Sequence, residues 1–297
     1  MTRRDRMRLW RDASLAAGLD LLRASCFDYR YPEHSHDEFV VAVFSRGAQR
    51  HRVSRHRGVA SAGMLLIIPP GEVHAGEAAE PESGWDYRAF YPSPDLLAGI
   101  ADDRLGGSGG VAFGPQVLRE DAALVRRLLH AHAVIERSRD PLEKHCALDA
   151  ALGALVARYG ERTGRGPLPP SPGAPIREAV AFLEAHHHRP IHVGEVAAAA
   201  GLSEFHFMRA FRRATGLTVH RYLTQVRLRR AKDLLARGIG AAEAAVSVGF
   251  FDQSHLINQF RAQFGVTPGR FAAASRPAAH STPSAARTQA GSPASST

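Results

Sequence analysis

The hydrophobic residues between positions 38 and 91 are spaced as in short strands. Residues 38–45, 49–54, 64–68 and 85–91 are runs rich in Val, Ile and aromatic side chains. Glycines at positions 47, 58, 63, 71 and 84 punctuate these runs. Short strands at this spacing are typical of a small antiparallel sandwich or barrel. We therefore predict a small antiparallel sandwich or barrel in this part of the chain.

Between residues 117 and 159 the hydrophobic positions change to the period of a helix. The first stretch places apolar side chains at Leu118, Ala122, Val125, Leu128 and Leu129. The second places them at Leu142, Cys146, Leu148, Leu152, Leu155 and Val156, and Asp140 followed by Pro141 marks its start. Two amphipathic helices are expected, which pack either on the barrel or against a second copy in a homodimer.

Two segments have few side chains to bury. Residues 161–175 contain eight Gly or Pro in fifteen positions, which predicts an interdomain linker stiffened by its prolines. Residues 273–297 are dominated by Ala, Ser, Pro and Thr, which predicts a disordered tail. The chain therefore divides into a barrel with two helices at 1–160, a linker at 161–175, a helical domain at 176–272 and a tail.

The helical domain repeats one pattern twice. Residues 193–200 form a helix of small side chains, Gly201 follows as a turn, and Ser203 begins a second helix as its N-cap. Residues 241–248, a turn at 249–250 and a helix over 252–264 repeat this arrangement, and a long helix over 219–237 joins the two units. This spacing is typical of helix-turn-helix units.

Each second helix has an apolar face and a face available to a partner. In the first unit Phe207, Ala210, Phe211 and Ala214 are predicted to be core, and in the second Leu256, Phe260 and Phe264. The opposite faces carry Phe205, Met208, Arg209 and Arg212, and Gln253, Ser254, Ile257, Asn258 and Arg261. Gln and Asn can contact adenine in two places and Arg is the usual reader of guanine, so both faces can read a DNA major groove.

The charge is distributed unevenly between the two halves. The whole chain has a formal net charge of +9. Residues 1–160 hold 21 basic and 21 acidic side chains, whereas residues 176–272 hold 13 and 7, a balance of +6. A basic module beside a neutral one indicates a polyanion-binding domain joined to a domain with another task.

The residues from Ile176 to Phe271, including the closing GVTPGRF, resemble the DNA-binding domain of the AraC/XylS family of bacterial transcription regulators. The resemblance implies that double-stranded promoter DNA is a partner, with RNA polymerase as a further one. It implies that side chains of both reading helices contact DNA, and Arg229 of the joining helix is expected to contact a phosphate. The expected DNA-binding residues are Ser203, Phe205, His206, Met208, Arg209, Arg212, Arg229, Gln253, Ser254, Asn258 and Arg261. Many family members carry Arg where this chain has Asn258, so the second helix is expected to read a different base or to contribute less.

The first half resembles the cupin-type sensor domains of the same family. The stretch GMLLIIPPGEVH, ending at His74, fits the second cupin motif, and His34-Ser35-His36 resembles the start of the first. Three histidines can form a metal site, but Val40 and Val41 stand where metal-binding cupins carry a carboxylate. Glu38 is in phase with His34 and His36 and can face the same interior, so a metal site stays an alternative. The resemblance implies a small organic effector instead, contacted by His34, His36, His74 and Tyr87, without a metal or another cofactor.

These observations predict a multidomain α+β protein. A cupin-like β-barrel and two helices are followed by an all-α domain with two helix-turn-helix units. The expected function is an effector-controlled transcription regulator, not an enzyme, that acts as a homodimer. The alternative is a metal-dependent cupin enzyme with a nucleic-acid-binding appendage. No run of apolar residues is long enough to span a membrane and there are only two cysteines, so a cytoplasmic location is expected.

Overall fold

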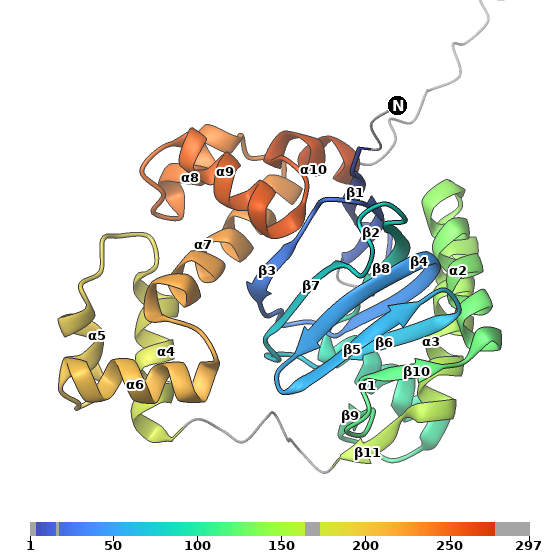
Figure 1. Cartoon of the computed structure of the whole chain (residues 1–297), viewed down its shortest axis with the longest axis horizontal. Coiled ribbons are helices and arrows are strands. Elements are labelled where there is room, and N and C mark those ends of the chain that lie inside the picture. Colours follow the sequence, from blue (N-terminus) through green and yellow to red (C-terminus); the bar gives the residue numbers. More distant parts are fainter. Residues whose placement is uncertain (1–3, 16–17, 164–172, 277–297) are drawn as a thin grey trace, which may run out of the picture.

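A computed structural model describes residues 4–15, 18–163 and 173–276. It has a β-rich N-terminal half with three helices and an all-helical C-terminal half, as the sequence predicts (Figure 1). The strands are β1 (Arg6–Asp12), β2 (Leu19–Cys26), β3 (Tyr31–His34), β4 (Val40–Val53), β5 (His56–Ser61), β6 (Met64–Ile68), β7 (His74–Ala78), β8 (Trp85–Tyr91), β9 (Gly110–Ala112), β10 (Leu118–Glu120) and β11 (Glu161–Thr163). The helices are α1 (Pro94–Leu105), α2 (Ala122–Arg137), α3 (Pro141–Tyr159), α4 (Ala174–His186), α5 (Val193–Ala199), α6 (Glu204–Thr215), α7 (Val219–Ala236), α8 (Ala241–Ser247), α9 (Gln253–Phe264) and α10 (Pro268–Ser275).

The strand β4 organises the barrel. Its first part pairs with β6 and β8, and its second part pairs with β5 and β7. The sequence predicts two strands here, but the structure has one strand whose register shifts between Phe44 and Arg46. Gly47 follows with a φ of 63°, and a Cβ at this position would lie 1.9 Å from the carbonyl oxygen of Gly84. The glycine therefore bends the strand without ending it.

The two faces of the sheet enter different cores. Along β4, Val40, Ala42 and Phe44 pack inside the barrel, whereas Val41 and Val43 pack on the other side with α1, α2 and α3. Successive side chains of a strand point to opposite faces, so an uninterrupted apolar run indicates a strand covered on both sides.

The helices α2 and α3 pack on the outer face of the sheet. Asp140 caps α3 by accepting a hydrogen bond from the backbone nitrogen of Leu142, so the predicted start is confirmed. Leu118 was expected in the first helix, but it lies in β10, which pairs with β6. The exposed side chains of Leu142 and Cys146 on α3 do not contribute to this core. The homodimer stays a prediction.

The limits of the linker and tail differ from those expected. Glu161–Thr163, the start of the predicted linker, forms β11 and pairs with β9. The helix α4 begins at Ala174, and the rest of the predicted linker, 164–172, lies outside the described residues. At the other end α10 extends to Ser275, whose hydroxyl accepts a hydrogen bond from the backbone nitrogen of Arg11 at 2.9 Å. Ala273 to Ser275 are therefore helical, and 277–297 lie outside the described residues.

Candidate functional site

The first helix-turn-helix unit consists of α5, a turn and α6. Gly201 adopts a φ of 64°, a left-handed conformation that suits glycine, and Ser203 is the N-cap of α6. The Ser203 hydroxyl lies 3.2 Å from Nδ1 of His206. Phe207 and Phe211 are buried in a core that α4, α5 and α6 share with the start of α7. This unit therefore has a hydrophobic core separate from that of the barrel.

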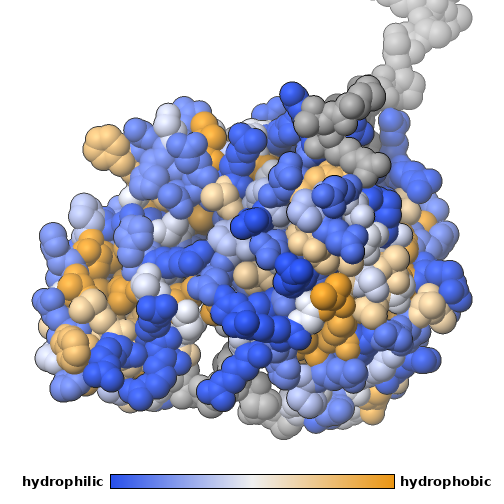
Figure 2. Space-filling view, in the orientation of Figure 1, coloured by the Kyte–Doolittle hydropathy of each residue, from blue (hydrophilic) through white to orange (hydrophobic). Residues whose placement is uncertain are grey.

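The outward face of α6 carries the predicted reading residues. Phe205 and Met208 are 62% and 46% exposed, and Arg209 and Arg212 are also exposed. The guanidinium carbon of Arg209 lies 5.5 Å from the centre of the Phe205 ring. Hydrophobic side chains gather on the surface around α5 and α6 (Figure 2). Ala214, predicted to be core, is exposed; it lies in the last turn of α6, after Phe211, the last buried residue of this helix.

The second unit, α8 and α9, has the same construction. Gly249 has a φ of 89°, and the Asp252 side chain accepts a hydrogen bond from the backbone nitrogen of His255 at 2.7 Å. Leu256, Phe260 and Phe264 are buried as predicted. The predicted reading residues on the outer face of α9, Gln253, Ser254, Asn258 and Arg261, are exposed. Both reading faces are therefore accessible from solvent in this arrangement.

The joining helix α7 contacts the sensor half through charged side chains. Lys232 is buried, and its Nζ lies 2.7 Å from Oδ2 of Asp20 and 3.8 Å from Oε1 of Glu38. Arg11 also contacts both halves, because it binds Asp20 at 2.7 Å and Asp233 of α7 at 2.9 Å. Burial of Lys232 works against its charge, but the carboxylates of Asp20 and Glu38 raise its pKa above the ordinary value. The lysine is therefore charged at neutral pH.

Arg229, expected at a phosphate, lies in the same interface. Its guanidinium is 2.5 Å from Oδ1 of Asp37 in the sensor half and also pairs with Glu184 of α4. Arg227 donates to the backbone carbonyls of His187 and Arg189 instead. A guanidinium held between two carboxylates is not available to a phosphate in this arrangement. The structure therefore places Arg229 at the domain interface.

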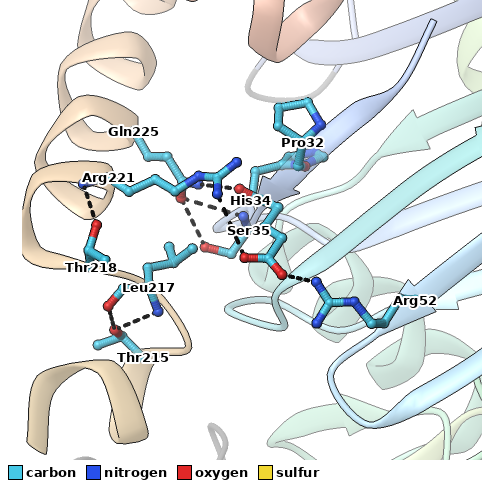
Figure 3. A network of polar contacts seen from close by, with 10 residues as sticks. Pro32, His34, Ser35, Arg52, Thr215, Leu217, Thr218, Arg221 and Gln225 are labelled. Atoms are coloured by element: carbon cyan, nitrogen blue, oxygen red, sulfur yellow. Dashed lines mark hydrogen bonds and ion pairs between the residues drawn. The ribbon is translucent and has the colours of Figure 1, made fainter. Parts of the chain in front are cut away.

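A polar network continues the interface toward the start of α7 (Figure 3). The Gln225 amide accepts from the Ser35 hydroxyl at 3.3 Å and donates to the Glu33 carbonyl at 3.4 Å. The Glu33 carboxylate pairs with Arg221 of α7 at 3.6 Å and with Arg52 of β4. The segment of residues 33–38, which contains His34 and His36, is thus bound to α7.

Apolar packing joins the barrel to the second helix-turn-helix unit. One continuous core contains Leu9 and Leu22 of the barrel together with Leu228 of α7 and Phe260 and Phe264 of α9. The Tyr29 hydroxyl donates to the carbonyl of Ala262 at 2.9 Å. The second unit therefore shares a core with the barrel, whereas the first unit has a core of its own.

The predicted effector residues lie around one small cavity. His34, His36, His74 and Tyr87 all line a space of about 40 Å³ inside the barrel. His34 and His74 are paired residues of the antiparallel strands β3 and β7. His36 is held by the turn after Pro70, because its carbonyl accepts from the backbone nitrogen of Gly71 at 2.8 Å. The sequence expectation that these side chains share one interior is confirmed.

The histidine rings form a close group. The ring centres of His34 and His74 are 4.2 Å apart, and those of His36 and His74 are 5.2 Å apart. Burial lowers the pKa of all three, to about 4 for His74, and the neighbouring rings lower the pKa of His34 and His36 further. All three imidazoles are therefore neutral at pH 7.

Tyr87 closes the other side of the cavity. Its hydroxyl donates to the hydroxyl of Tyr31 at 2.6 Å, and its ring stacks against Phe44 at 5.7 Å between centres. Burial raises the pKa of both tyrosines well above the ordinary value. Both hydroxyls therefore stay protonated and can hydrogen-bond a ligand.

The sequence interpretation missed the residues that connect the cavity to α7. Asp20, His36, Lys232 and Phe264 line a second small space that adjoins the first. One signal was available, since Asp20 stands between apolar residues of a buried strand and a buried carboxylate requires a cationic partner. Lys232 is one of only two lysines in the chain, but nothing in the local pattern pairs it with Asp20.

Comparison with known proteins agrees with both halves of the structure. Residues 17–152 match the AraC-like ligand binding domain, and residues 196–274 match a helix-turn-helix domain. The chain is 26% identical over 227 residues to the HTH-type transcriptional regulator YbfI of Bacillus subtilis, covering 76% of this chain and 82% of that protein. It is 25% identical over 247 residues to the transcriptional activator RhaS of Salmonella schwarzengrund, covering 80% and 86%.

A solved structure has the same fold over almost the whole chain. The crystal structure of apo ToxT K231A from Vibrio cholerae superimposes with a TM-score of 0.55 and 9% identity, covering 92% of this chain and 97% of ToxT. The two matched domains, their order and the regulators that share them lead to one assignment. The chain belongs to the AraC family of transcriptional regulators, with an N-terminal ligand-binding domain and a C-terminal helix-turn-helix DNA-binding domain.

Proposed function

We propose that a ligand in the barrel cavity controls how the two reading helices engage promoter DNA, by changing the contact between the barrel and α7. The observation that carries this proposal is the position of α7. It joins the two helix-turn-helix units and binds the barrel through Arg229 and Lys232. His36 of the cavity and Lys232 line the same space. A change at the cavity therefore acts on a side chain of the DNA-binding domain directly.

The DNA contacts are assigned to α6 and α9. In α6, Arg209 and Arg212 supply guanidinium donors, and exposed Phe205 and Met208 supply apolar contacts of the kind thymine methyl groups accept. In α9 the exposed amides of Gln253 and Asn258 suit adenine. Arg229 is assigned to the interface and not to DNA.

The ligand acts by binding the docked and undocked arrangements with different affinities. Lys232 of α7 and Phe264 of α9 line the space that adjoins the cavity. A ligand that displaces these two side chains favours the undocked state, and by linkage the DNA arrangement that needs that state. The second unit responds most, because its core is continuous with that of the barrel.

Further partners and the location follow from the family. We propose that the chain acts in the bacterial cytoplasm, where its DNA is, and that RNA polymerase is a further partner. We also propose that it forms a homodimer through the exposed face of α3 that carries Leu142. In the described part of the chain, no helix has both the length and the apolar character to span a bilayer. The relatives are transcriptional regulators, and we propose that the barrel binds its ligand without converting it.

The test is a charge exchange across the interface. Genomic fragments selected by the full-length protein first define its DNA site. Arg229→Glu places a carboxylate beside Asp37 and Glu184 and should change the affinity for this DNA, whereas Arg229→Glu combined with Asp37→Arg should restore it. Equal affinities for the wild type, the single variant and the double variant would show that this interface does not control DNA binding.

A further inference from the structure

We propose that the histidine cluster of the barrel is a binding site for a divalent transition-metal ion, held by His34, His36 and His74. This deepens the proposed function by naming the class of ligand that the sensor takes. One potential ligand atom from each residue lies within 4.8 Å of those of the other two. The sequence favoured an organic effector, since no carboxylate follows His36 at the spacing of metal-binding cupins.

The hydrogen bonds of the rings orient them for an ion. Nδ1 of His34 lies 2.7 Å from the carbonyl oxygen of Pro32, and Nδ1 of His74 lies 3.0 Å from that of Glu72. A neutral ring that donates through Nδ1 keeps its lone pair on Nε2. Histidine ligands of metal ions are oriented by this kind of second hydrogen bond. Two of the three rings thus already have the tautomer that binds a metal.

The distances fit an ion after a small movement. Three nitrogens bound tetrahedrally at about 2.1 Å from zinc lie about 3.4 Å from one another. The potential ligand atoms of the three histidines lie at most 4.8 Å apart. Each pair therefore has to approach by about 1.4 Å or less to bind one ion, which rotation of the side chains can provide. His34 and His74 occupy paired positions on adjacent strands, which places their side chains next to each other on one face.

The size of the cavity favours an ion over an organic molecule. About 40 Å³ holds an ion with one or two waters, whereas pockets for organic ligands usually measure about 300–1000 Å³. Neutral imidazoles select Zn²⁺, Cu²⁺, Ni²⁺ or Fe²⁺ over the oxygen-preferring Mg²⁺ and Ca²⁺. Three protein ligands leave a position for water or a second ligand beside Tyr87.

Glu38 does not complete the site as a carboxylate ligand. It lies near Lys232, with Oε1 at 3.8 Å from Nζ, and is absent from the group of close ligand atoms found among the described residues. The site therefore has three neutral ligands, and a bound divalent ion keeps its full charge. Lys232, which shares a cavity with His36, faces that charge.

The experiment titrates tag-free, full-length protein with Zn²⁺ against a chromophoric chelator, and records the absorption of the Co²⁺ form. One tight equivalent and a Co²⁺ spectrum of four-coordinate intensity are expected. His36→Gln and His74→Gln should each lower the affinity at least tenfold. The matched control replaces His187 and His188 by alanine, since residues 186–188 are a run of three histidines outside the barrel, and should keep the wild-type affinity.

Three results would overturn the inference: no bound equivalent, equal affinity in the wild type and His36→Gln, or loss of binding in the His187 and His188 control alone. Electron paramagnetic resonance of Cu²⁺ in that control protein counts the nitrogen ligands without a variant in the cluster, and fewer than two would also overturn it. Promoter binding is measured on the same samples. Intact promoter binding without metal binding refutes this inference alone, whereas absent promoter binding refutes the proposed function.

Discussion

Two arginines of the DNA-binding domain show how surroundings decide what a residue does. Arg209 projects from α6 with its guanidinium carbon 5.5 Å from the centre of the Phe205 ring, and among the described residues it forms no ion pair. Arg229 lies between Asp37 and Glu184. A guanidinium without a carboxylate partner can bind a base edge, whereas a paired one would first have to break its ion pairs.

Arg209→Ala should weaken binding to the selected promoter site by about 1–3 kcal/mol, because a bidentate contact to a base is lost. Binding to unrelated DNA should change much less. Fluorescence anisotropy with both DNAs at one salt concentration measures the difference. Arg57→Ala, which removes an exposed charge from the sensor half, is the control and should alter neither. Equal losses on both DNAs would mean that Arg209 contacts only phosphate.

His132 of α2 is a buried histidine outside the sensor cavity. Its Nδ1 accepts a hydrogen bond from Arg88 at 2.8 Å, and its Nε2 is buried. The rings of Trp10 and Phe90 pack against it at 5.3 and 5.1 Å between centres. Burial, and then the charge of Arg88, lower its pKa to about 3 against the opposing carboxylate of Glu136. The ring is therefore held neutral.

This histidine should make the stability depend on pH. Its folded pKa lies below the ordinary value near 6.5, so its contribution is complete above about pH 6.5 and decreases as the pH falls toward about 3. One such group lowers the free energy of unfolding by about 1.4 kcal/mol per pH unit in that window. His132→Gln keeps an acceptor for Arg88. Denaturant unfolding of this variant should show that the free energy of unfolding depends less steeply on pH, by the equivalent of one proton. An unchanged slope would contradict the assignment.

At the scale of elements, α7 has two functions. Its buried residues Leu228, Ala231 and Leu235 belong to the core shared with the barrel. Its charged residues Arg221, Arg229 and Lys232 pair with carboxylates of the sensor half. A basic helix in a DNA-binding domain suggests phosphate contacts. In α7, however, carboxylates of the sensor half neutralise the charges of Arg221, Arg229 and Lys232.

Lys232→Met should loosen the docking of α7. A buried ion pair that loses one partner costs about 3–5 kcal/mol, and the expected loss here is about 2 kcal/mol because Asp20 retains Arg11. Small-angle scattering should show a larger radius of gyration. Lys144→Met is the matched control, because Lys144 pairs with Asp12 at 2.6 Å within the sensor half. A larger radius in the control, or none in Lys232→Met, would contradict a docking role for Lys232.

At the scale of the whole molecule, the sensor cavity and the DNA-binding domain share a boundary. The barrel interior, α7 and α9 belong to one core, whereas α4, α5 and α6 have their own (Figure 1). A positive charge introduced at the histidines repels Lys232 most strongly, because Lys232 and His36 line the same space. The ligand is therefore expected to move the second unit relative to the barrel.

Zn²⁺ should expand the wild-type protein, because the ion and Lys232 repel each other across the shared cavity. A chelator should return the radius of gyration to the metal-free value. Small-angle scattering of both states measures the change, and His36→Gln should have the same radius with and without Zn²⁺. A wild-type radius that Zn²⁺ leaves unchanged would show that the metal does not control docking.

Several features could be predicted from local signals. Gly201 and Gly249 adopt left-handed conformations at the two turns, and Asp140 and Asp252 cap the helices that they precede. Strands β6 and β8 begin and end where the apolar runs do. Features that depend on distant partners were missed or misassigned, such as the bend of β4 at Gly47 beneath the carbonyl of Gly84.

The sequence alone predicted the apolar strands between residues 38 and 91, the helices after them, the two domains and the paired reading helices. These follow from periodicity, caps and strand alternation, which act over a few residues. The gathering of His74 with His34 and His36 was expected from the resemblance to the cupin motifs. The local pattern did not indicate that Arg229 meets Asp37, 192 positions earlier, or that Lys232 meets Asp20. Such pairs depend on how two complete domains pack. The same packing leaves a space of about 40 Å³ beside the histidines.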